Sequence, residues 1–151
     1  LGLEPQSITG LCVMALAYDR AGLPDSARLY AHRILATSSL PARIGEAAYV
    51  LARNGDRRDA ELLTRQLEAM PENTWTRWTA LDLAYNGLDD TARALVALDH
   101  AAAGDGDEWP TYGITYAKEL SPSPHIAAIL RRYNLDPAYV LIRRDTERRA
   151  Q

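Results

Sequence analysis

Apolar residues recur at three- and four-residue steps over most of the first hundred positions, which is the spacing of one face of an α-helix. Between about residues 56 and 70, for example, Ala60, Leu63, Leu67 and Met70 fall on one face. The pattern predicts six helices, at about 8–21, 24–37, 41–53, 56–70, 74–86 and 89–103. Because the turns between them are short, we expect neighbouring helices to run antiparallel.

A glycine closes one helix of each predicted pair, and an alanine five residues later lies in the next helix. The three pairs are Gly22 with Ala27, Gly55 with Ala60, and Gly87 with Ala92. Glycine can adopt the left-handed conformation that ends a helix, and Asp56 and Asp89 follow where an N-cap is needed. The glycines lie 33 and 32 residues apart, a period typical of solenoids built from helical hairpins.

The segments LAYDRAGLPDSA, YVLARNGDRRDA and LDLAYNGLDDTA carry a resemblance to the tetratricopeptide repeat. In that register Ala15 takes a small-residue position, Tyr18 the tyrosine and Pro5 the proline that ends a preceding repeat. The resemblance implies an all-α fold, a right-handed superhelical solenoid of antiparallel helix pairs. It divides one domain, 1–151, into parts: 1–7 as the tail of a preceding repeat, 8–41 and 42–73 as repeats, 74–104 as a degenerate repeat, and 105–151 as a C-terminal cap.

The repeat pattern stops at about residue 103, and two short helices are predicted after it, at about 123–133 and 137–149. Their apolar stripes and many arginines suit helices that cap the last apolar face of a solenoid. Residues from about 75 to 137 also resemble the end of repeat arrays in multi-domain bacterial regulators, where the array follows a kinase, a nucleotide cyclase or a winged-helix domain. This second resemblance implies the C-terminal fragment of a larger signalling protein, serving as a scaffold or a sensor.

Composition narrows the class of partner. The formal net charge of −3 is too close to zero to indicate a nucleic-acid partner, and no run of eighteen apolar residues predicts membrane insertion. The single cysteine, Cys12, excludes an internal disulfide framework. We expect a cytoplasmic protein, with a periplasmic or other extracytoplasmic location as the alternative.

Residues that could carry chemistry are sparse. His32, His100 and His125 lie in different segments, and none has a second histidine or a cysteine at the spacing of metal ligands. The acidic stretch 105–108 lacks the full spacing of a calcium loop, and the chain has neither a nucleophile elbow nor a phosphate-binding loop. We therefore expect no enzyme activity, no metal site and no cofactor.

The family register implies which side chains line the concave groove, because the first helix of each pair faces inward. The candidate binding residues are Cys12, Leu16, Asp19, Arg20, Tyr49, Arg53, Arg77, Leu81 and Tyr85. Aromatic and arginine side chains of this kind anchor many protein interfaces. Leu16, Tyr49 and Leu81 replace the asparagine that some family members use to clamp a C-terminal carboxylate, which disfavours that mode. An equal alternative is that Tyr49 and Tyr85 pack between helices.

Trp75 and Trp78 are three residues apart, so we expect them to share a helix face and to seal the third repeat against the tail, with Trp109 nearby. An aromatic ligand cage is the less favoured alternative. For the whole chain we expect a protein-interaction module that binds a peptide or protein segment in its groove. A ligand-sensing domain controlling an attached catalytic or DNA-binding domain is the alternative, and a spacer that self-associates is a third.

Overall fold

The computed structural model describes residues 7–103 and residue 131, and within these residues the chain forms helices and no strands. The predicted all-α class is confirmed. The helices are α1 Ile8–Arg20, α2 Pro24–Thr37, α3 Pro41–Arg53, α4 Arg57–Glu68, α5 Arg77–Gly87 and α6 Thr91–Ala103. None of the described helices is both long enough and apolar enough to cross a bilayer. Apart from Ser7 and Arg131, the expected tail of a preceding repeat and the C-terminal cap helices lie outside the described residues, as do Trp109 and His125.

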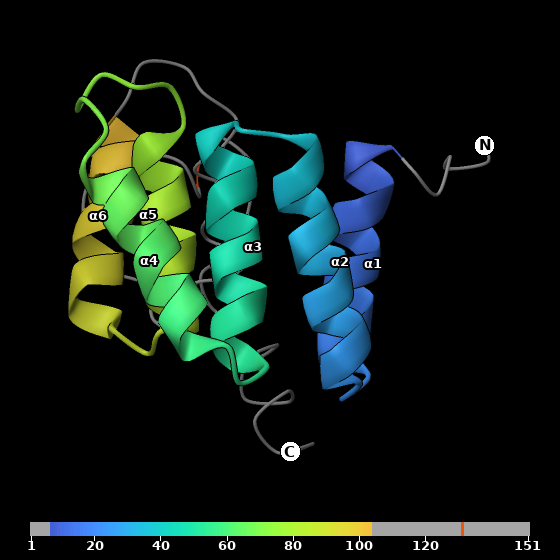
Figure 1. Ribbon diagram of the computed structural model, residues 1–151. Helices are drawn as coiled ribbons and strands as arrows, with labels where there is room; N and C mark the ends of the chain where they lie inside the picture. Colours follow the sequence, from blue (N-terminus) through green and yellow to red (C-terminus); the bar gives the residue numbers. More distant parts are fainter. Residues whose placement is uncertain (1–6, 104–130, 132–151) are drawn as a thin grey trace.

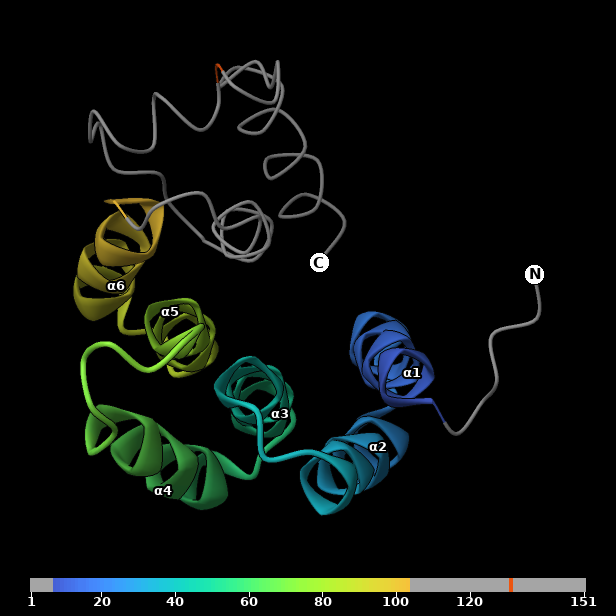
Figure 2. The same cartoon turned by 90° about the horizontal axis from the view of Figure 1, so that it is seen from above.

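The six helices stand side by side, and each packs against the next one along the chain (Figure 1). Seen from above, α1, α3 and α5 form an inner row along a curve, and α2, α4 and α6 form an outer row (Figure 2). The inner helices also contact one another, α1 with α3 and α3 with α5. Both rows share an apolar core, with Leu51, Leu67 and Leu83 fully buried in it.

The turns within the three helix pairs follow one design, in which a residue with positive φ ends the first helix. Gly22 and Gly55 take this role as predicted, with φ of 68° and 96°. In the third pair the predicted left-handed turn residue, Gly87, is wrong. Gly87 is the last residue of α5, and Asp89 adopts the positive φ, 64°, instead. The residue after each of the three donates its backbone N–H to the carbonyl five residues earlier, as in a Schellman turn: Leu23 to Tyr18, Asp56 to Leu51 and Asp90 to Tyr85.

The position of the buried alanine near the start of each outer helix depends on the position of the turn. Ala27 and Ala60 are fully buried, as expected for the closest contact between two helices. Ala92 is exposed, and Ala94, five residues after Asp89, is buried in its place. The third pair is therefore displaced by two residues from the register that the glycines predict, and the structural offsets between equivalent residues are 33 and 34.

The expected capping aspartates also differ. Asp56 precedes α4, but its side chain makes no capping hydrogen bond. Asp90, rather than the predicted Asp89, caps the start of α6 by accepting a hydrogen bond of 3.1 Å from the backbone N–H of Arg93.

Two glycines allow the backbones of α3 and α5 to come into contact where these two inner helices cross. A Cβ on Gly45 would lie 2.5 Å from the carbonyl oxygen of Ala80, and one on Gly87 would lie 2.7 Å from the Cα of Tyr49. Where α1 crosses α3, the equivalent contact joins Cys12 to Glu46, which lie 33 and 34 residues before Gly45 and Ala80 respectively. Side chains therefore separate α1 from α3, whereas α3 and α5 touch through their backbones.

Thr76 connects α5 to α3 through an unusual backbone conformation. It precedes α5 with φ of 60°, a left-handed conformation that is uncommon for a β-branched residue. Its hydroxyl accepts a hydrogen bond of 3.2 Å from the backbone N–H of Ala42, in the first turn of α3. This N–H has no partner inside its own helix, so the contact satisfies a group that would otherwise be buried without one.

Candidate binding surface

An ion pair and an amide join the C-terminal ends of α1 and α3 on the inner row. The guanidinium Nε of Arg53 lies 3.0 Å from one carboxylate oxygen of Asp19, and the side-chain amide of Asn54 donates a 2.8 Å hydrogen bond to the other. The guanidinium carbon of Arg53 also lies 5.3 Å from the ring centre of Tyr49, within range of a cation–π contact. Burial acts to lower the pKa of Arg53, but Tyr49 and Asp19 outweigh it and raise the pKa overall.

Four of the predicted groove residues remain accessible next to this junction. Leu16 and Tyr49 are half-buried, while Arg20 and Arg53 are exposed. Leu16 with Tyr49, and Arg20 with Arg53, are equivalent residues 33 positions apart, so they repeat one arrangement on adjacent helices. We call Leu16, Arg20, Tyr49 and Arg53 the inner strip. Asp19 instead belongs to the structural junction, since its side chain is only 6 % exposed.

Cys12 is buried rather than open to a groove. Its thiol donates a 3.0 Å hydrogen bond to a carboxylate oxygen of Glu46, which is itself 2 % exposed. Arg43 binds both oxygens of the same carboxylate, at 2.9 and 2.8 Å. Sequence reasoning missed Glu46 and Arg43; the available signal was a carboxylate within the otherwise apolar run IGEAAYVLA.

Burial and the negative charge of Glu46 raise the pKa of the Cys12 thiol from its ordinary value of 9.0 to about 12. We therefore expect iodoacetamide to alkylate Cys12 at pH 8 on the order of a thousandfold more slowly in the folded protein than in urea, because the thiolate is the reactive form. Since the folded state holds this proton more tightly, the contribution to stability is complete below pH 9 and is lost as the pH rises towards 12. Mass spectrometry of the quenched protein gives the rate, and equal rates in both states would contradict the buried thiol.

The third set of predicted groove residues lies in the core. Arg77 is 8 % exposed, Leu81 1 % and Tyr85 7 %. The two-residue displacement of α5 explains this outcome: Arg77, Leu81 and Tyr85 are equivalent to Arg43, Ala47 and Leu51, not to the residues of the inner strip. The true equivalents of the strip, Leu83 and Gly87, are buried as well, so the accessible part of the predicted groove is confined to α1 and α3.

Tyr85 instead takes part in a polar network at the outer row. Its hydroxyl donates a 2.8 Å hydrogen bond to Glu68, and Arg93 pairs with both Glu68 and Asp90. Burial, together with the Glu68 carboxylate, raises the pKa of Tyr85 to about 12. The hydrogen bond from Arg93 lowers the pKa of Asp90.

This network borders a hollow of about 570 Å³ between α4 and the turn that joins α5 to α6. Its lining is mostly charged, and it includes Arg57, Arg93, Glu61 and Asp90. Arg57 pairs with Glu61 and also donates to the carbonyl of Leu88, so the arginines and carboxylates of the hollow largely bind one another.

Trp75 and Trp78 do not share a helix face. Trp75 precedes α5 and is 57 % exposed, and the tail that it is expected to seal lies outside the described residues. Trp78, within α5, is half-buried and stacks on His100, with ring centres 4.2 Å apart. Arg77 lies over the Trp78 ring at 4.5 Å. These contacts are those of a packed aromatic residue joining α5 to α6.

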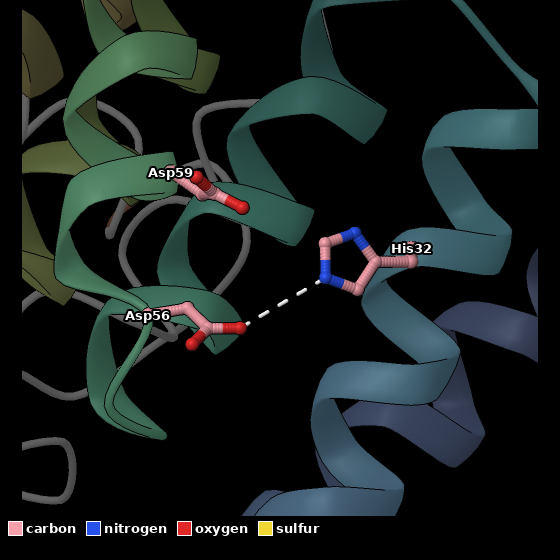
Figure 3. A group of neighbouring side chains, drawn as sticks. All are labelled: His32, Asp56 and Asp59. Atoms are coloured by element: carbon pink, nitrogen blue, oxygen red, sulfur yellow. Dashed lines mark ion pairs between the residues drawn. The ribbon is translucent and has the colours of Figure 1, made fainter.

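The fold brings one histidine next to two carboxylates that are distant in sequence. His32 on α2 points towards Asp56 and Asp59 at the start of α4 (Figure 3). One ligand atom from each lies within 4.8 Å of the others, and Nε2 of His32 is 3.9 Å from Asp56. Asp56 also lies 3.7 Å from Arg28, a cation that competes with any bound ion. The helix dipole stabilises acidic residues in the first turn of a helix. The positions of Asp56 and Asp59 are therefore explained by the start of α4 without a bound ion.

The inner strip is therefore the part of the described surface where predicted binding residues are both clustered and accessible. Comparisons with models of protein families, with curated proteins and with solved structures gave no match to this chain.

Proposed function

We propose that the chain is a protein-interaction module, a solenoid of tetratricopeptide-like helical hairpins that binds a peptide segment along the inner strip. The curved double row of helices and the recurrence of equivalent turns support the solenoid. The structural offsets of 33 and 34 residues are close to the length of the family's repeat.

The observation that carries the binding proposal is the chemistry of the inner strip. Leu16 and Tyr49 offer apolar surface, and Tyr49 is held against the guanidinium of Arg53. Arg53 is oriented by Asp19, so part of the entropy of ordering this long side chain is lost before a partner arrives. Arg20 adds a second cation one helix away. A segment with an apolar side chain next to a carboxylate fits this arrangement.

A ligand-sensing role would use the hollow beside α4, whose volume lies in the range of small-molecule sites. Such sites are mostly apolar with a few polar groups, whereas this hollow is lined by charges that pair with one another. Peptide binding at the inner strip is the function that the geometry favours.

Reversing one charge of the inner strip tests the proposal. We expect Arg20→Glu to reduce capture of a peptide partner at least tenfold, because it replaces an attractive cation with a repelling anion. Arg58→Glu on α4 is the matched control, since Arg58 is an exposed arginine of the outer row and its substitution changes the net charge equally. Arg53→Glu is unsuitable, because it would set a second carboxylate against Asp19 and weaken the fold.

The measurement is quantitative pull-down from cell extract, followed by titration of the identified peptide. Circular dichroism should show the same helix content and melting temperature for both variants. Loss of binding with Arg20→Glu alone supports the inner strip. Equal binding by the two variants, or equal loss, places the partner elsewhere and contradicts the proposal.

A further inference from the structure

One face of α1 is open although its composition is that of a buried face. Val13, Ala17 and Ala21 are exposed, with Val13 at 48 %, and Met14 is half-buried. The four residues lie at i, i+1, i+4 and i+8, so they form one apolar stripe along the helix. We call them the α1 face. The stripe lies beside Leu16 and Arg20, but it shares no residue with the inner strip.

The equivalent faces of α3 and α5 are completely covered. With offsets of 33 and 34 residues, they are Glu46, Ala47 and Val50 on α3 with its C-cap Asn54, and Ala80, Leu81 and Ala84 on α5 with its C-cap Leu88. All eight residues are at most 9 % exposed. The same position in the hairpin is therefore a buried interface twice and an open surface once.

The structure also shows what covers this face in the two later hairpins. On α3, Glu46 meets Cys12 of α1, and Asn54 meets Asp19 of α1. Val50 and Ala47 join a core cluster with Ala31 and Ile34 of α2. On α5, Ala80 meets Gly45 of α3, and Leu81 and Ala84 cluster with Leu67 of α4. In each case the covering element is the whole preceding hairpin, with both its inner and its outer helix.

We propose that the α1 face docks one further helical hairpin of the same type, joined to the start of α1 as α2 is joined to α3. We expect a small residue to lie opposite Val13, because Cys12 and Gly45 lie opposite the equivalent residues of α3 and α5. Arg20 is equivalent to Arg53, so a carboxylate at the position of Asp19 completes the contact. The proposal extends the array and rests on the α1 face, which lies outside the inner strip; Arg20 is the one residue that belongs to both contacts, so the test below uses Ala17 instead.

The α1–α2 hairpin itself meets these requirements, which makes a duplication the direct test. A copy of residues 7–39 inserted between Gln6 and Ser7 keeps the native spacing, because Ser7 then takes the place that Leu40 has before α3. Asp19 of the upstream copy would face Arg20 of the downstream copy. We expect the inserted hairpin to fold cooperatively with the rest, and the midpoint of urea unfolding to rise together with the m-value.

Substitution of Ala17 distinguishes docking from independent folding. In the downstream copy of the duplicated chain, Ala17→Glu would bury a carboxylate, and we expect the melting temperature to fall by roughly 5–10 °C. The same substitution in the upstream copy, or in the chain without an insertion, stays on an open surface and should change it by less than about 2 °C.

Three results would overturn the proposal. One is an inserted hairpin that remains unfolded, seen as a fall in helix content per residue. Another is an equal effect of Ala17→Glu in both copies. The last is a concentration-dependent dimer of the unmodified chain that Ala17→Glu dissociates in light scattering, because the α1 face would then bind a second copy instead. If the duplicated chain precipitates, co-expressing residues 7–39 as a separate fragment and assaying co-purification with the wild-type or Ala17→Glu chain decides the same question, and absence of co-purification counts against docking.

Discussion

Replacing Gly45 with alanine should lower the free energy of unfolding by about 3 kcal/mol. The new Cβ would lie 2.5 and 2.6 Å from the carbonyl oxygen and Cα of Ala80. These are backbone atoms, so no side-chain rotation relieves the overlap and α5 has to move away from α3. The loss is expected even though alanine favours a helix over glycine by about 1 kcal/mol. Urea unfolding followed by circular dichroism measures the change.

Gly22→Ala is the matched control. Gly22 has positive φ, but a Cβ there would meet nothing within 4 Å, so only the cost of a left-handed alanine applies, about 1–2 kcal/mol. Gly87→Ala should behave like Gly45→Ala, because its Cβ would meet the backbone of Tyr49. If Gly45→Ala proved neutral or stabilising, the close contact of α3 with α5 would be contradicted.

Arg77→Met should cost about 2–3 kcal/mol of stability. Arg77 is buried, and its guanidinium donates hydrogen bonds of 3.0 Å each to the carbonyls of Leu67 and Glu68, at the end of α4. Carbonyls in the last turn of a helix lack the usual partner four residues later, and Arg77 of α5 donates to both of these, while the Leu67 carbonyl also accepts from the backbone N–H of Met70. Methionine fills a similar volume with an apolar chain and removes both guanidinium hydrogen bonds, so that of these contacts only the one from the backbone N–H of Met70 to the Leu67 carbonyl, 3.2 Å, remains.

Arg65→Met provides the comparison, since Arg65 is an exposed arginine near the end of α4, the helix whose carbonyls Arg77 contacts. We expect its effect to stay within about 0.5 kcal/mol. The difference between the two midpoints of urea unfolding then isolates the buried hydrogen bonds. Two similar values would mean that the Arg77 contacts contribute little, contrary to this account of the end of α4.

The sequence predicted the helices well, because each has both an apolar period and a local signal at its ends. Five of the six begin within two residues of the predicted position, and α5 begins three residues late. Leu23 and Leu40 precede proline at the first position of α2 and α3, which is a favoured start for a helix. Gly22 and Gly55 end their helices as expected, because glycine tolerates positive φ without steric cost.

The predicted groove agrees less well with the structure, because its residues on α5 are buried. When a repeat register is assigned from residue types, one mistaken residue shifts every other position in that repeat. The sequence pattern predicts a turn at Gly87, because a glycine marks each of the two earlier turns. In the structure its lack of a side chain serves close packing against Tyr49, and Asp89 makes the turn. The register of the third hairpin therefore differs from the predicted one by two positions, and Arg77 and Leu81, which the predicted register places in the groove, lie in the core.

The sequence by itself determined the all-α class and the approximate extent of the helices, because these depend on local periodicity and on local signals at the helix ends. Only the tertiary structure decided the register of the third hairpin and the buried contacts of Cys12 with Glu46 and of Arg77 with the end of α4. It also showed which face of α1 lacks the cover that α3 and α5 have. The physical reason is that burial and close contact join residues about 10–35 positions apart, and helix propensity does not encode which distant surface will cover a given face.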